Sequence, residues 1–251
     1  MVRRLLIDTA AKQNKEFNLR GEAQTRIETL SDAVFAFAIA LLVLSSSVPE
    51  RYDELILSMQ DIVPFGVCIA LLMLIWYQHF IFFIRYGLQD AKIIVLNTIL
   101  LFLILFYVYP LKFLFRVLYK LFYALFTGDR AISQELFTVT IKPEDAPDLM
   151  AIYGIGASLI FILLALMYWY ALKKARSLKL NPKEIFETRT SIYKNVFMGI
   201  VPLISALIAF VGVGDTGTTF TLSGISYWLY MLVMPTFSIM RERVRKKKWD
   251  R

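Results

Sequence analysis

Three apolar stretches of this sequence each carry polar side chains near one end. Asp32 stands at the start of the first stretch, Trp76 and His79 lie near the end of the second, and Asn97 lies about one turn into the third. If consecutive stretches cross a membrane in opposite directions, these side chains share one layer. Each is costly in hydrocarbon alone and is satisfied by the others. We therefore predict a hydrogen-bonded cluster that joins the three stretches.

These residues do not form a catalytic set. The chain has a single histidine, His79, and its apolar stretches contain no pair of carboxylates and no cluster of metal ligands. The lone Cys68 lies within an apolar stretch, which leaves no intrachain disulfide and no cysteine cluster. We therefore predict that the chain is not an enzyme and uses no cofactor. A plainer interpretation of His79 is that it is a hydrogen-bonded packing residue.

The first stretch also carries an uninterrupted apolar face. At helical spacing this face combines bulky side chains with small ones. Its members are Leu30, Ala33, Phe37, Leu41, Leu44 and Val48, with Ala36 and Ala40 beside them. Small residues let helices approach closely in a membrane, whereas the bulky ones would form stacked constrictions if several copies surrounded an axis. Because one such face cannot enclose a water path, we expect several chains around one axis.

Two plainer interpretations of this stretch stay open. Its basic leader, short apolar run and the following SSSVPE resemble a cleavable signal peptide, although Asp32 at the start of the run is atypical of one. Alternatively, Ser31 and Asp32 only cap the helix, and the apolar face is ordinary packing.

The composition indicates an all-α polytopic membrane protein. Of the 251 residues, 58% are hydrophobic and 15% aromatic, which is too apolar for a soluble domain. Six apolar runs are each near the ~20 residues that a transmembrane helix needs. Their approximate ranges are 30–48, 62–84, 93–117, 151–172, 192–213 and 220–240.

The distribution of basic residues predicts the topology. Lysine and arginine gather before the first run, after the second, after the fourth and after the sixth, so both termini are expected in the cytoplasm. The net charge of +8 then reflects topology, and we predict no nucleic-acid partner.

The expected divisions of the chain follow from this topology. Residues 1–25 are a basic cytoplasmic arm that contains a short surface helix, and residues 26–240 are the six-helix transmembrane domain. Within that domain, an external loop at about 118–150 holds a short helix and an extended segment. Residues 241–251 are a basic cytoplasmic tail, which is more often a topology signal than a lipid-binding element.

The first half of the chain resembles the lysosomal and bacterial potassium channels called transmembrane protein 175. The family's first helix carries R-x-x-x-F-S-D before an apolar run of the type AVFAIAITLLVL. Here Arg26 begins a similar motif that ends at Asp32 and precedes AVFAFAIALLVL. Trp76 and His79 are similar to the family's W-x-x-H, and Asn97 to its third-helix asparagine. The second half of the chain matches only in its hydropathy.

The resemblance implies a potassium-permeable channel in the cell membrane, built as a homotetramer whose first helix lines a central pore. In the family, apolar side chains rather than carbonyl groups narrow that pore. By position, Phe37, Leu41 and Leu44 would form the constriction, with Ala40 beside it where the family has threonine. The inter-helix polar network would comprise Arg26, Ser31, Asp32, Trp76, His79 and Asn97. Potassium would be the permeant ion, no other metal would be bound, and the lipid bilayer would surround the assembly.

Other functions remain open on the sequence alone. A secondary transporter would usually show internal repeats and interrupted spans; Pro202 and Pro235 are candidates for interruption, but no repeat is visible. A membrane scaffold without transport activity is a third possibility. The segment 211–215, VGVGD, resembles a carbonyl-lined potassium filter, but the spans on either side leave no room for the required half-helix. We therefore predict that it is a tight external turn.

Overall fold

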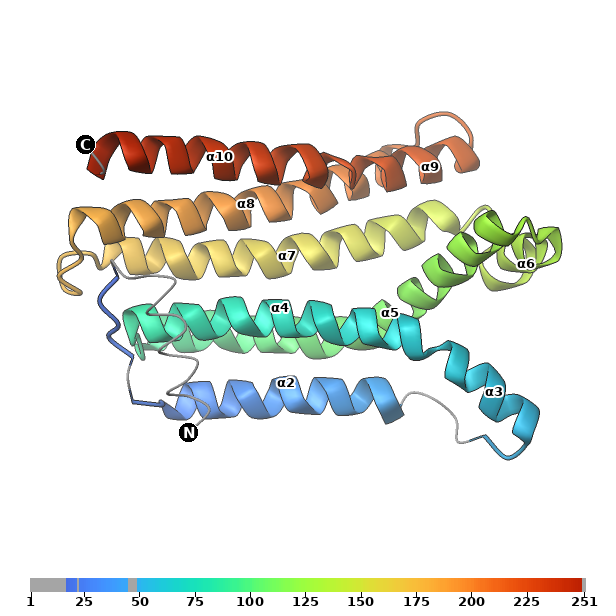
Figure 1. The fold of residues 1–251 in the computed structure, drawn as a ribbon, viewed down its shortest axis with the longest axis horizontal. Coiled ribbons are helices and arrows are strands. Elements are labelled where there is room, and N and C mark those ends of the chain that lie inside the picture. The colour runs from blue at the N-terminus through green and yellow to red at the C-terminus, as the bar shows by residue number, and fades with distance from the viewer. Residues whose placement is uncertain (1–16, 22, 45–48, 250–251) are drawn as a thin grey trace.

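The apolar runs fold into long helices that lie side by side, as the computed structural model in Figure 1 shows. The structure describes residues 17–21, 23–44 and 49–249. A surface helix was expected in the arm 1–25; its described residues, 17–21 and 23–25, are not helical, and the rest of the arm, like Val48, lies outside these ranges. The helices of membrane length are α2 (Arg26–Leu44), α4 (Ile62–Tyr86), α5 (Ala91–Thr127), α7 (Ala146–Lys173), α8 (Pro182–Val211) and the consecutive pair α9 (Thr216–Ser226) and α10 (Leu229–Trp249).

The prediction of six membrane-spanning segments is confirmed, because six segments of the described chain are long and apolar enough to cross a bilayer. Their ends differ from the expected ones. Helix α5 continues to Thr127, well past the expected end of its span at residue 117, and α10 runs through the predicted tail as one helix to Trp249.

The segment at about 118–150, predicted to be partly extended, is helical. It contains the end of α5, then α6 (Arg130–Glu135) and the π-helical turn η1 (Leu136–Thr140), and a further short helix, α3 (Tyr52–Gln60), follows α2. The expectation of an extended segment after the short helix is therefore wrong, although its β-branched residues favour strands. The wide turn, closed by the hydrogen bond from Ile141 N to Leu136 O at 2.9 Å, buries both side chains against Val117.

The segment VGVGD forms a turn, as predicted. Gly212 and Gly214 have φ values of 71° and 80°, and the side chain of Asp215 then accepts from Thr218 N to begin α9. Positive φ values favour glycine because an L side chain clashes there. No half-helix precedes the turn, since α8 continues without a break to Val211.

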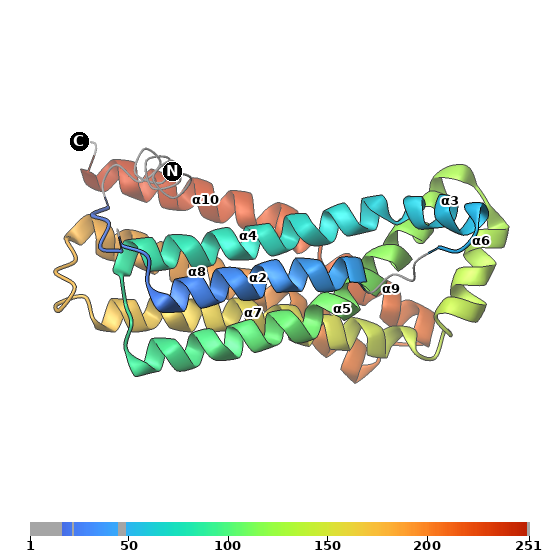
Figure 2. The ribbon, with the colours of Figure 1, turned by 90° about the horizontal axis from the view of Figure 1, so that it is seen from below.

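The helices pack in layers (Figure 1). Helices α7 and α8 make the most extensive contact, α9 and α10 lie on α8, and α5 joins α7 to the α2–α4 side. Helix α2 lies at the outer edge of this stack against α4 and α5, and Figure 2 shows it running along both. We call the end at which α2, α5 and α8 begin the basic end, since Arg20, Arg85, Lys174 and Arg241 lie there.

Candidate functional site

Helix α2 has two different faces. Ser31, Phe35, Ala38 and Leu42 are buried in the main core, whereas Phe37 is 55% exposed on the opposite side. Only 28% of the helix is buried within the chain, although its mean hydropathy is 2.0. An apolar face of this kind needs either lipid or another protein surface against it.

Asp32 connects α2 to α4. Its Oδ1 accepts from Trp76 Nε1 at 2.8 Å, and its Oδ2 accepts from Gln24 Nε2 at 3.2 Å. The Trp76 ring stacks on Phe80 at 5.5 Å between centroids, which holds the indole in place. Asp32 thus accepts hydrogen bonds on both carboxylate oxygens, which is how a carboxylate is made tolerable near hydrocarbon.

Ser31 connects α2 to α5. Asn97 Nδ2 donates to Ser31 Oγ at 3.0 Å, and Ser31 Oγ donates to Ile27 O at 2.8 Å. Because the amide nitrogen of Asn97 is the donor to Ser31, its Oδ1 accepts from His79 Nε2 at 2.7 Å, which assigns the proton to that nitrogen. His79, Asn97 and Ser31 are all buried.

The structure therefore brings together five of the six residues assigned to the polar network. Adjacent positions on α2 point about 100° apart, so Ser31 reaches Asn97 on α5 while Asp32 reaches Trp76 on α4. His79 joins the Ser31 branch and also lies against Phe83, with 4.7 Å between ring centroids. Arg26 is the exception, because it is exposed and has no polar partner among the residues that the structure describes.

The residues assigned to the constriction are not equally exposed. Phe37 is 55% and Leu44 is 74% exposed, and Ala40 between them is exposed as well. Leu41 is only partly exposed and packs against the main core. The exposed stripe thus runs through Phe37, Ala40 and Leu44, and Leu41 lies at its border.

Sequence reasoning missed a polar contact at the other end of α2. Lys112 of α5 is 7% exposed, and its Nζ donates to Leu42 O at 2.9 Å. A cation at the C-terminal end of a helix is favourable because the last carbonyl groups there lack helical partners. The sequence did indicate that Lys112 needs a polar partner, because it is an ionisable residue inside an apolar run.

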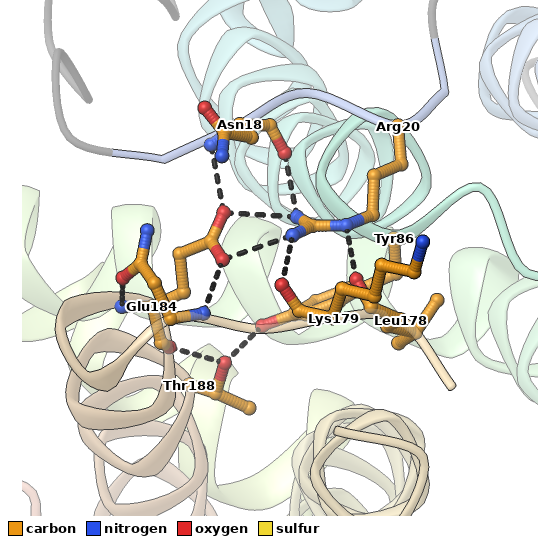
Figure 3. A network of polar contacts seen from close by, with 8 residues as sticks. Asn18, Arg20, Tyr86, Leu178, Lys179, Glu184 and Thr188 are labelled. Carbon is orange, nitrogen blue, oxygen red and sulfur yellow. Dashed lines mark hydrogen bonds and ion pairs between the residues drawn. The ribbon is translucent and has the colours of Figure 1, made fainter. Parts of the chain in front are cut away.

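Sequence reasoning also missed the contacts of the segment that precedes α2, which Figure 3 shows. Arg20 donates from Nη1 and Nη2 to the two carboxylate oxygens of Glu184, both at 2.9 Å, and from Nε to Leu178 O at 2.7 Å. Glu184 is fully buried and also accepts from Asn18 N at 2.8 Å. A bidentate ion pair therefore connects this segment to the first turn of α8.

Glu184 has a second role in the start of α8. Its side chain accepts from Asn181 N at 2.8 Å while the Asn181 side chain accepts from Glu184 N at 2.9 Å, which is a capping box. Asn18, Arg20 and α8 are consequently joined at one carboxylate, and the path into α2 is fixed relative to α8 at the basic end.

The fold and these contacts define a polytopic α-helical membrane protein in which the second and third spans hold one side of the first. Within the described residues, no group of three or more His, Cys, Asp or Glu side chains is placed to hold a metal ion. The Cys68 thiol is buried and free. What the arrangement offers chemically is hydrogen bonding within the membrane layer and an uncovered apolar face.

Comparisons with known proteins identify the family. The model of the endosomal/lysosomal potassium channel TMEM175 matches residues 26–107, which include α2, α4 and the first half of α5. A potassium channel of Marivirga tractuosa is 46% identical over 246 residues, covering 98% of this chain and 97% of that protein.

A crystal structure of a variant of the potassium channel MtTMEM175, in complex with a nanobody–MBP fusion protein, has the same fold. Its TM-score is 0.80 at 47% sequence identity, and the match covers 93% of this chain and 98% of that one. The chain belongs to the TMEM175 potassium channel family. Membership confirms the predicted family and the prediction that the chain is not an enzyme, but the likeness extends over both halves of the chain rather than the first alone.

Proposed function

We propose that this chain forms a potassium-permeable pore in which the exposed face of α2 surrounds a central axis. The observation that carries the proposal is this face, because a membrane helix packed on α4 and α5 leaves Phe37 and Leu44 uncovered. Four copies would bring four such faces together, and the relatives of this chain named above are potassium channels.

In this proposal apolar side chains control the path. Four Phe37 rings would form the narrowest layer, on the half nearer the basic end, and Leu44 would form a second layer farther along. Leu41 would border the path, and Ala40 would line it without a hydroxyl group. A narrow apolar ring excludes water and so stops a hydrated cation without carrying charge.

The polar contacts of α2 would set the position of this path. Asp32 with Trp76, and Ser31 with Asn97 and His79, fix the rotation of α2 near the basic end. Their loss would let the helix turn or shift, and the pore-facing residues would change with it. Arg26 would contribute only through another chain or the lipid head groups.

The topology proposed for the assembly follows the positive-inside rule. The basic end, with residues 17–25 and the last turns of α10, would face the cytoplasm, and the α3, α6 and η1 elements would lie outside.

Flux measurements test the proposal. The purified protein is reconstituted in liposomes, and potassium and sodium fluxes are measured separately, together with native mass spectrometry of the complex. We expect conductive potassium flux and a mass of four chains. Flux that saturates and is coupled to a second ion would indicate a transporter, and a monomer or a dimer without a central path would refute the tetrameric pore.

The alanine at position 40 provides a second test. The family resemblance places threonine there, and a ring of hydroxyl groups contacts a partly dehydrated ion where alanine does not. We expect Ala40→Thr to raise the ratio of potassium to sodium flux. An unchanged flux ratio in Ala40→Thr would show that residue 40 does not line the path.

A further inference from the structure

A cavity of about 310 Å³ lies between α4, α7 and α8 and belongs to none of the sites described above. Its lining residues are mostly polar and include no acidic side chain: Tyr77, Gln78, Ile81, Arg85, Tyr168, Ser191, Lys194 and Asn195. The residues that α4 contributes lie within about 14 Å of the basic end of that helix at 1.5 Å per residue. That depth is where spanning helices meet lipid head groups.

The cavity is positively charged. Arg85 is 8% exposed and donates from Nη1 to Ser191 Oγ at 3.2 Å, which fixes its guanidinium group at the wall. Lys194, one turn farther along α8, is exposed and makes no ion pair or hydrogen bond with any residue that the structure describes. Two cations beside hydroxyl groups, with no lining carboxylate, suit a phosphate group.

Asn195 offers a hydrogen-bond acceptor that a ligand in the cavity could use. It is 1% exposed, its Nδ2 donates to Ser191 O at 2.9 Å, and its Oδ1 has no hydrogen-bond partner. The contact with a carbonyl group assigns the amide orientation, because the reverse orientation would place two oxygens together. A buried acceptor without a donor is unfavourable, so a ligand that carries a hydroxyl group would satisfy it.

The wall of the cavity continues toward the middle of the membrane as an apolar surface. Leu74, Gln78, Ile81 and Arg85 recur at helical spacing on one face of α4, and Leu74 is 59% exposed. A head group in the cavity would therefore have an apolar strip beside it for an acyl chain. This continuity favours a lipid over a free phosphate ion.

We propose that this cavity binds the head group of an anionic, hydroxyl-bearing glycerophospholipid. The phosphate lies between Arg85 and Lys194, and a hydroxyl group of the head donates to Asn195 Oδ1. The site is separate from the exposed face of α2 and does not depend on whether that face conducts ions.

Lipid binding to the purified full-length protein tests this proposal. Native mass spectrometry and thermal stability in detergent are measured with phosphatidylglycerol, with phosphatidylmethanol, which has the same charge without a hydroxyl group, and with soluble glycerol phosphate. We expect Lys194→Gln to weaken phosphatidylglycerol binding about fivefold, which is the contribution of one lysine near an anionic surface. Lys247→Gln removes the same charge from α10 at the same end, outside the cavity, and should leave binding unchanged.

Asn195→Leu separates the two parts of the site. This substitution should weaken the binding of phosphatidylglycerol and leave the binding of phosphatidylmethanol unchanged. Only phosphatidylglycerol has a head-group hydroxyl that could donate to Asn195 Oδ1. Equal effects of Lys194→Gln and Lys247→Gln would overturn the proposal, because binding would then depend on surface charge alone. Binding of glycerol phosphate without binding of either lipid would overturn the lipid assignment.

Discussion

Replacing Phe37 with alanine distinguishes a pore-lining ring from a packing residue. Truncating a phenylalanine to alanine in a well-packed core lowers the free energy of unfolding by about 3 to 5 kcal/mol. Phe37 is 55% exposed, so a little under half of its side chain is covered by its own chain. Scaling the core value by that fraction gives a loss of about 1.5 to 2 kcal/mol from packing within the chain.

The same substitution should widen and wet the constriction. We therefore expect Phe37→Ala to raise single-channel conductance while lowering thermal stability only modestly, and Phe37→Trp to reduce conductance. Phe35→Ala is the matched control, because Phe35 is 3% exposed on the opposite face of the same helix and packs against His79 with 5.8 Å between ring centroids. That control should lose the full ~3 to 5 kcal/mol, with its channel activity limited by folding.

Single-channel recording and a thermal melt of all three variants decide between the two interpretations. A conductance like that of the parent, in a Phe37→Ala protein as unstable as Phe35→Ala, would refute the assignment of Phe37 to the path. It would mean that the uncovered ring packs between chains without facing an axis.

Three further changes test the contacts at the basic end, each with thermal unfolding as the measurement. Asp32→Ala leaves an indole N–H without its acceptor and should cost about 1 to 3 kcal/mol with altered channel activity; parent-like behaviour would show that the contact with Trp76 is dispensable. Arg20→Gln leaves the fully buried Glu184 charge unpaired, and we expect a loss of about 3 kcal/mol. Burial raises the pKa of Asp90, but the hydrogen bonds from Lys174, from Ile93 N and from Tyr170, together with the Lys174 charge, outweigh it and hold that pKa below its usual range. The pair therefore stabilises the protein above pH ~4 and stops doing so as pH falls through the lowered value, so Lys174→Gln should destabilise at pH 7 and have no effect in strong acid.

The sequence was sufficient for the spans and for most of the polar layer. Long apolar runs have few alternatives in a chain of this composition, and the costs of Asp32, His79 and Asn97 in hydrocarbon require partners at the same depth. The depth of each follows from its distance to the end of its span. Depth alone does not determine which of these residues form hydrogen bonds with one another. The two separate contacts, Ser31 with Asn97 and Asp32 with Trp76, could be found only from the packing of the helices.

The missed contacts are those between residues far apart in the chain. The ion pair from Arg20 to Glu184 spans 164 residues, and both residues looked like ordinary charges at helix boundaries. The segment at about 118–150 was misjudged for a different reason. Its β-branched residues favour a strand in isolation, but burial of Leu136 and Ile141 favours the wide helical turn.

The rotation of α2 about its axis explains why the exposed stripe differs from the expected one. Relative to Phe37, Leu41 is turned about 40° one way and Leu44 about 20° the other, so a stripe that contains all three is wide. Polar contacts fix the helix near its start, and Lys112 contacts Leu42 O in its last turn, which together turn Leu41 toward the core and leave Leu44 at 74% exposure. Periodicity specifies which residues share a face, but contacts with neighbouring helices decide which edge of that face stays uncovered.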